Sequence, residues 1–239
     1  MAPASTAPSL CPSPTRYGSG IPRRWLRPLV VAVAMVASPG HATVADPIPP
    51  GMTERQHDLL VYAWHEGMKR NLAVTTASIL LQESSAGTDH KVGDRSNGFG
   101  RRSYGVMQLQ LRAAYDALEH CPELGSFRTE EEVIARLIHD DRWNIRVGVC
   151  FLDRLNSRTN MTWRELITAY NRGIQGSRAV DPDSFPYTLG VVAHATAGGL
   201  VGDNRAYFQR KAEERYGPAL RDRERPATEV AIDLPLYWH

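Results

Sequence analysis

The sequence predicts a mainly α-helical protein, with about seven or eight helices in a domain of about 175 residues. Apolar residues recur at spacings of three and four along most segments, which is the helical period. Helix-start residues precede several of these segments, and glycines follow them. No alternating run is long enough to predict a convincing strand. The chain has 239 residues, which suggests one domain with extra segments or two small domains.

Residues 1–45 differ in composition from the rest of the chain. Arginines at 23, 24 and 27 precede a short apolar run over 29–37, and small residues follow up to Ala45. This order is typical of a secretory signal peptide. The alternative is an uncleaved anchor, although the run is short for spanning a bilayer. We expect an exported protein of the periplasm or cell envelope, with no stable membrane insertion after signal cleavage.

The composition of the chain indicates an ordinary globular protein. Hydrophobic residues make up 42%, charged residues 23%, and the net charge is +2. No dense basic run interleaved with aromatics appears, so we expect no nucleic-acid partner. Removal of the signal would leave two cysteines, Cys121 and Cys150. In an oxidising compartment they form either a disulfide or two buried thiols.

The first two helices follow a proline-rich entry. Thr53 is a candidate start for the first, and a second runs over about 74–85 with Gly87 as its stop. Apolar side chains recur every fourth residue in the first helix: Leu60, Trp64 and Met68. A polar loop with three glycines, over 89–104, comes directly after the second helix. Loops of this kind often contact substrates.

The later helices carry clear start and stop residues. Thr129 precedes a helix whose first turn is acidic, Thr162 opens a capping box with Glu165, and Gly173 is a predicted stop. We expect further helices over about 111–118, from Asp140 or Asp141, over 187–195, and from Asp203 to Tyr216. The domain is expected over 46–220, and 221–239 is expected to be a tail.

Glu83 is the strongest catalytic candidate. It falls in the last turn of a predicted apolar helix, where the helix dipole disfavours a negative charge. The residues three and four positions away are Ile79, Leu80, Ala86 and Gly87, so no local cation can pair with it. Burial, an unfavourable dipole and the lack of a partner all raise a carboxyl pKa. The alternatives are a general acid and a solvated glutamate at a frayed helix end.

Four segments in order resemble the soluble lytic transglycosylases, which have a lysozyme-like domain. They cover about residues 55–195. The segments read Glu83-Ser84, Gly105-Val106-Met107-Gln108, Asn144-Ile145-Arg146-Val147-Gly148 and Ala169-Tyr170-Asn171, and Tyr187 follows where that family has a further tyrosine. The resemblance implies a lysozyme-like helical domain with a long loop after the catalytic helix.

The resemblance also implies roles for these residues. Glu83 would be the catalytic acid and then base in non-hydrolytic cleavage of peptidoglycan glycan strands, giving 1,6-anhydro-N-acetylmuramic acid. Substrate-binding roles are implied for Ser84, Gln108, Tyr170, Asn171 and Tyr187. No cofactor and no metal are implied. A secretion or conjugation apparatus is a partner expected by analogy alone.

Two other functions remain open at this stage. A hydrolase of the same fold, similar to goose-type lysozyme, would need a second carboxylate, for which Asp89 and Asp94 are candidates. A non-catalytic peptidoglycan-binding component of a secretion system is the second. Retention of Glu83 and of the Ala-Tyr-Asn segment argues against it.

Overall fold

The computed structural model describes residues 51–88, 102–158, 160–197, 199–202 and 204–219. The predicted leader over 1–45, the loop residues 89–101, the helix-starting Asp203 and the predicted tail over 221–239 lie outside these ranges. None of the described helices is both long and apolar enough to cross a membrane.

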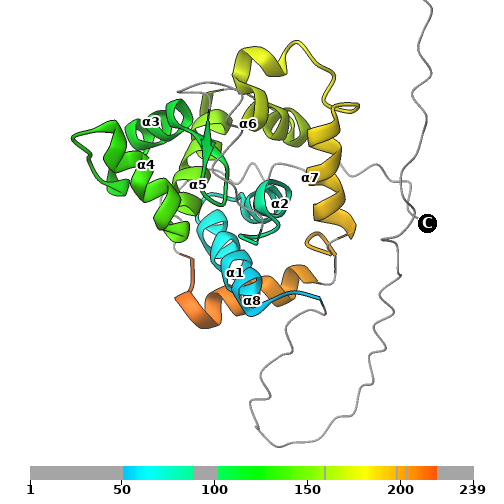
Figure 1. The fold of residues 1–239 in the computed structure, drawn as a ribbon. Coiled ribbons are helices and arrows are strands. Elements are labelled where there is room, and N and C mark those ends of the chain that lie inside the picture. The colour runs from blue at the N-terminus through cyan, green and yellow to red at the C-terminus, as the bar shows by residue number, and fades with distance from the viewer. Residues whose placement is uncertain (1–50, 89–101, 159, 198, 203, 220–239) are drawn as a thin grey trace, which may run out of the picture. The chain divides into compact units, whose positions relative to one another are not determined.

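The described residues form eight α-helices and very little strand, so the prediction of a mainly α-helical protein is confirmed (Figure 1). The helices are α1 (Glu54–Met68), α2 (Ala73–Ser84), α3 (Leu111–His120), α4 (Glu130–His139), α5 (Asp141–Arg158), α6 (Trp163–Ser177), α7 (Pro186–Ala197) and α8 (Asn204–Tyr216). A short 3₁₀ helix, η2 (Pro122–Leu124), follows α3. Strands β1 (Ser103–Tyr104) and β2 (Leu109–Gln110) pair antiparallel.

The predicted helix starts at Thr53, Thr129 and Thr162 are N-caps in the structure. Each threonine hydroxyl accepts a hydrogen bond from the backbone N–H three residues later, which satisfies one of the free donors of the first turn. Gly173 differs from expectation. It has φ 71° and ψ 167°, and the chain resumes helical geometry beyond it to Ser177. A glycine permits this kink within α6, where the sequence predicted an end.

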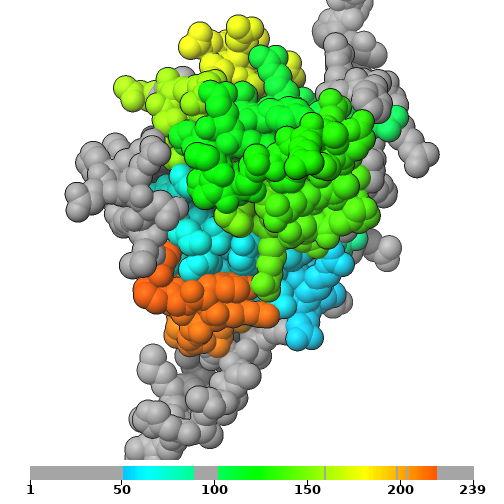
Figure 2. Space-filling model, turned by 90° about the vertical axis from the view of Figure 1, so that its left-hand side faces the viewer, coloured from blue at the N-terminus to red at the C-terminus, as the bar shows by residue number. Residues whose placement is uncertain are grey.

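Helix α5 contacts α1, α3, α4 and α6, while α2 packs between α1 and α7. In Figure 2, α8 (orange) lies directly against α1 (blue to cyan), in agreement with their contacts. Two buried tryptophans tie the elements together through their indole N–H groups. Trp143 of α5 donates to the Leu124 carbonyl at 3.0 Å, and Trp163 of α6 donates to the Thr75 hydroxyl at 2.9 Å.

A disulfide joins Cys121 to Cys150. Cys121 is the C-cap of α3, Cys150 lies in α5, and their Cα atoms are 6.2 Å apart. This separation is ordinary for a disulfide. Of the two alternatives left by the sequence, the structure has the covalent bridge, which fastens α3 to α5.

Candidate functional site

The end of α2 has an unusual backbone. Directly after Glu83 and its neighbour, three consecutive residues have positive φ: Ser85 at 48°, Ala86 at 54° and Gly87 at 89°. Residues with a Cβ seldom adopt this region, and such strain persists only where surrounding contacts hold it. The Gln56 side chain from the first turn of α1 supplies one contact, because its Nε2 donates to the Ser85 carbonyl at 2.9 Å.

Ser84 supports this turn from inside the protein. Its side chain is buried, and its hydroxyl donates to the Leu80 carbonyl at 3.2 Å and accepts the Gly87 N–H at 3.0 Å. The resemblance implies a substrate-binding role for Ser84. In the structure its hydroxyl satisfies backbone groups at the helix end, where free carbonyls need partners.

The Glu83 carboxyl has a strongly shifted pKa. Burial raises it from 4.5 to about 7, because desolvation penalises the charged form. The Tyr187 hydroxyl donates to Glu83 Oε1 at 2.6 Å, and this hydrogen bond acts in the opposite direction by favouring the carboxylate. The sequence predicted the raised pKa. For Tyr187 the resemblance left two roles open, stacking on a sugar or hydrogen bonding near Glu83, and the structure has the hydrogen bond.

Helix α7 is held close to α2 at the position that brings Tyr187 to Glu83. One turn beyond Tyr187, Gly190 faces Gln82, and a Cβ on this glycine would lie 2.3 Å from Gln82 Oε1. On the other side of α7, the Thr188 and Thr168 hydroxyls are 2.7 Å apart and buried. A small residue facing α2 and a buried hydroxyl pair facing α6 therefore position Tyr187.

Tyr170 of α6 is the second tyrosine of the site. It is buried, and its hydroxyl donates to the Met107 carbonyl at 2.7 Å. Burial, followed by the negative charge of Glu83, raises its pKa well above the usual value. The same causes raise the pKa of Tyr187. Both phenols therefore remain neutral hydrogen-bond donors near one carboxyl group.

The turn that receives the Tyr170 hydroxyl is held by Asn144. The Asn144 Oδ1 accepts the Met107 N–H at 2.7 Å, and its Nδ2 donates to the carbonyls of Tyr104 and Leu137 at 3.0 and 3.1 Å. Gly105, with φ 70°, begins this turn, and a Cβ there would lie 2.1 Å from the Leu137 carbonyl oxygen. No larger residue fits between the turn and helices α4 and α5.

Gly148 lies one helical turn after Asn144 on α5 and makes room for Met107. A Cβ at this glycine would be 2.9 Å from Met107 Cε and 3.1 Å from its Cγ. Met107 itself is completely buried. In the pattern Asn-Ile-x-x-Gly, Asn144 and Gly148 thus hold the turn beneath Tyr170 in place, a physical role that sequence reasoning missed. An asparagine between the apolar residues Trp143 and Ile145 was the available signal in the sequence.

Gln108 and Asn171, the other two predicted binding residues, directly follow Met107 and Tyr170 in the chain. Gln108 has φ 46°, and its Nε2 donates to the Gly105 carbonyl at 2.8 Å, which closes the turn. Asn171 directly follows Tyr170 on α6 and is exposed. The structure therefore brings Glu83, Tyr170 and Tyr187 together, while Ser84 and Gln108 bond to nearby backbone.

One group of potential metal ligands occurs among the described residues. Cys121, Glu123 and Cys150 have ligand atoms within 4.8 Å of one another. The two sulfurs are joined in the disulfide, so neither is a thiolate, the form that binds metals. This group does not fit a metal centre.

Comparisons with protein-family models, with curated proteins and with solved structures found no match to this chain. The functional case therefore rests on the resemblance of the motifs and on the chemistry around Glu83.

Proposed function

We propose that this protein is a peptidoglycan lytic transglycosylase with a lysozyme-like fold. It would cleave the β-1,4 bond between N-acetylmuramic acid and N-acetylglucosamine without water and close a 1,6-anhydro ring. The observation that carries the proposal is the Glu83 carboxyl, which has a pKa of about 7 and accepts a hydrogen bond from the neutral Tyr187 phenol. Such a group can release and recover a proton near neutral pH.

The first step needs an acid. With a pKa of about 7, Glu83 is largely protonated below neutral pH and can protonate the glycosidic oxygen as the bond breaks. The carboxylate that remains would be stabilised by the Tyr187 hydroxyl, which donates to Oε1. Tyr187 therefore acts as a positioning residue that keeps the same oxygen oriented while the charge on Glu83 changes.

The second step needs a base and a nucleophile. Glu83, now a carboxylate, would take the proton from the 6-hydroxyl of N-acetylmuramic acid, and that oxygen would attack the anomeric carbon. The nucleophile belongs to the substrate, so one carboxyl group can perform both steps. A typical glycosidase uses two carboxylates.

The remaining predicted residues would bind the glycan. Asn171 is exposed beside Tyr170 and offers an amide to hydroxyl or N-acetyl groups. Gln108 lies in the turn beside Met107, and its Nε2 donates to the Gly105 carbonyl, so it would contribute to the shape of the groove at this turn. Aromatic side chains stack well on sugar rings, and the partly exposed Tyr187 ring suits this contact.

The test compares three proteins on purified peptidoglycan: the wild type, Glu83→Gln and Glu131→Gln. Glu131 lies on the exposed face of α4 and provides a matched control. Mass spectrometry of the released fragments should show anhydro ends for the wild type and for Glu131→Gln. We expect Glu83→Gln to lose activity by about 10³-fold, the size of a general acid–base contribution.

The same products separate the other two functions. Reducing ends would indicate a hydrolase, with a second carboxylate supplied from outside the described residues, where Asp89 and Asp94 lie. Binding of peptidoglycan without any fragment release would indicate a non-catalytic component. Full activity of Glu83→Gln would refute the assignment of the catalytic acid.

A further inference from the structure

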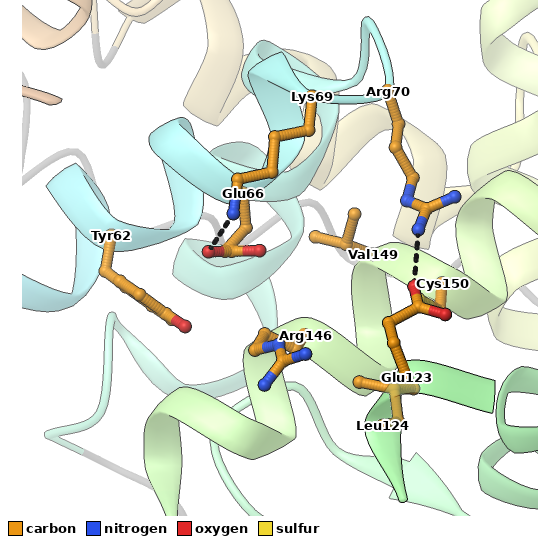
Figure 3. A pocket seen from close by; sticks show the side chains of 9 residues that line it. All are labelled: Tyr62, Glu66, Lys69, Arg70, Glu123, Leu124, Arg146, Val149 and Cys150. Carbon is orange, nitrogen blue, oxygen red and sulfur yellow. Dashed lines mark hydrogen bonds and ion pairs between the residues drawn. The ribbon is translucent and has the colours of Figure 1, made fainter. Parts of the chain in front are cut away.

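A cavity of about 330 Å³ lies between α1, η2 and α5, and none of the predicted catalytic or substrate-binding residues lines it. Figure 3 shows side chains from the three elements directed into this space. The lining residues are Tyr62, Glu66, Lys69, Arg70, Glu123, Leu124, Arg146, Val149 and Cys150. The volume is at the small end of the range for ligand pockets.

Two of the three cations at this cavity are paired. Lys69 contacts Glu66 at 2.9 Å, and Arg70 contacts Glu123 at 2.9 Å and the buried Asp153 at 2.8 Å. These pairs join α1 to η2 and to α5, so the walls of the cavity are tied together by ion pairs. Their charges are satisfied within the protein.

Arg146 is the third cation and has a different environment. It is half-buried on α5, and within the described part of the chain no ion pair or hydrogen bond engages its guanidinium. In Figure 3, Glu66 and Tyr62 extend from α1 toward the space that Arg146 borders. A half-buried guanidinium with five donors is a favourable partner for a planar carboxylate, which it can bind with two parallel hydrogen bonds.

We propose that this cavity binds a small zwitterion, an amino acid or a dipeptide, with its carboxylate on Arg146 and its ammonium group beside Glu66 and Glu123. A simple anion would engage only Arg146, whereas an ammonium group can also donate to the further acceptor lone pairs of the two glutamates. A simple cation would be repelled by Arg146. The side chains of Leu124 and Val149 provide apolar contacts for the ligand's carbon atoms.

The proposal is independent of the reaction at Glu83, and it is tested without peptidoglycan. Three probes are titrated calorimetrically into the full protein at neutral pH: glycylglycine, its amide and its N-acetyl derivative. Glycylglycine should bind, and the amide should bind at least about tenfold more weakly, as expected for loss of charge-assisted hydrogen bonds. The N-acetyl derivative should also bind more weakly.

Variants locate the site. Arg146→Gln should reduce the affinity for glycylglycine by at least about tenfold. Arg146→Lys keeps the charge but loses the two parallel N–H donors of the guanidinium, so its effect should be intermediate. Arg112→Gln, at an exposed position on α3, is the control and should bind as the wild type does. Bound probe should also raise the unfolding temperature of the wild type and not that of Arg146→Gln.

Three results would overturn the proposal. One is the absence of saturable binding by the wild type at millimolar glycylglycine. Another is equal affinity for the N-acetyl derivative, which would make the cavity a simple anion site. The third is unchanged affinity in both Arg146 variants, which would place the ligand elsewhere.

Discussion

Glu83 and Glu66 are both half-buried glutamates beside a tyrosine, and they differ in the side chains that engage them. Glu66 pairs with Lys69, three residues later on the same helix, at 2.9 Å. Glu83 receives the Tyr187 hydroxyl from a different helix, and burial is the main cause of its raised pKa. A cation favours the charged carboxylate, whereas burial favours retention of the proton.

The comparison shows that residue type alone does not prepare a carboxyl for proton transfer. What distinguishes Glu83 is that burial is not offset by a cation on the same helix turn. The cation is absent locally because Ile79, Leu80, Ala86 and Gly87 occupy the adjacent positions.

Asn144→Ala should have the largest effect on stability. It should disturb the turn beneath Tyr170, and hence the surroundings of Glu83, but not those of Glu66. It leaves the Met107 N–H and two carbonyls without their partners in a buried place. Each such group costs about 1–3 kcal/mol, so we expect a total loss of about 4 kcal/mol. Urea unfolding measures it. Asn156→Ala, on the same helix, should cost less than about 1 kcal/mol. Equal losses in the two variants would contradict the role of Asn144.

Glu83→Gln should make stability less dependent on pH. The Glu83 pKa is raised on folding from 4.5 to about 7, so the carboxyl is neutral in both states at low pH and costs nothing there. The cost grows between pH 4.5 and about 7 and is complete above that interval, where it amounts to up to about 3 kcal/mol. The glutamine variant avoids this cost, so its advantage over the wild type should increase with pH.

Urea unfolding of both proteins across this pH interval measures the difference. Glu131→Gln serves as the exposed control and should follow the wild-type curve. A constant difference between the wild type and Glu83→Gln at all pH values would contradict the raised pKa.

Tyr187→Phe should raise the pKa of Glu83 further, because the lost hydrogen bond favoured the carboxylate. Hydrogen bonds to charged groups contribute about 1.5–3 kcal/mol, and we expect the lower end of that range. Carboxyl NMR titration, with the Glu83 signal assigned by its absence from Glu83→Gln, measures the change. The exposed Tyr115→Phe is the matched control. A lowered pKa in Tyr187→Phe would show that the hydrogen bond favours the neutral acid.

Lys69→Met should have the smallest effect. The Glu66–Lys69 pair has i,i+3 spacing, and the side chains are 12% and 27% exposed. Pairs of this kind contribute less than about 1 kcal/mol. Lys211→Met removes a second i,i+3 pair, with Glu214 on α8, and should have a similar effect. A loss of several kcal/mol in Lys69→Met, without a similar loss in Lys211→Met, would contradict a minor contribution of the Glu66–Lys69 pair to stability.

Most helix positions could be predicted from the sequence because their signals are local. A threonine hydroxyl reaches only the N–H groups of the next turn, and a glycine relieves strain only at its own backbone. The starts at Thr53, Thr129 and Thr162 and the position of Glu83 in the last turn of α2 follow from such contacts. The kink at Gly173 was missed, because a local signal for an end does not reveal that helical geometry resumes beyond it.

The helical class, the position of Glu83 at a helix end and the lack of a cation beside it on that helix can all be read from the order of residues. Packing of distant segments is needed to bring the Tyr187 hydroxyl to Glu83 across 104 residues, to turn Ser84 toward the backbone and to join Cys121 to Cys150. The difference is one of distance along the chain. Backbone signals act within one helical turn, whereas desolvation and side-chain partners depend on which distant segments are packed together.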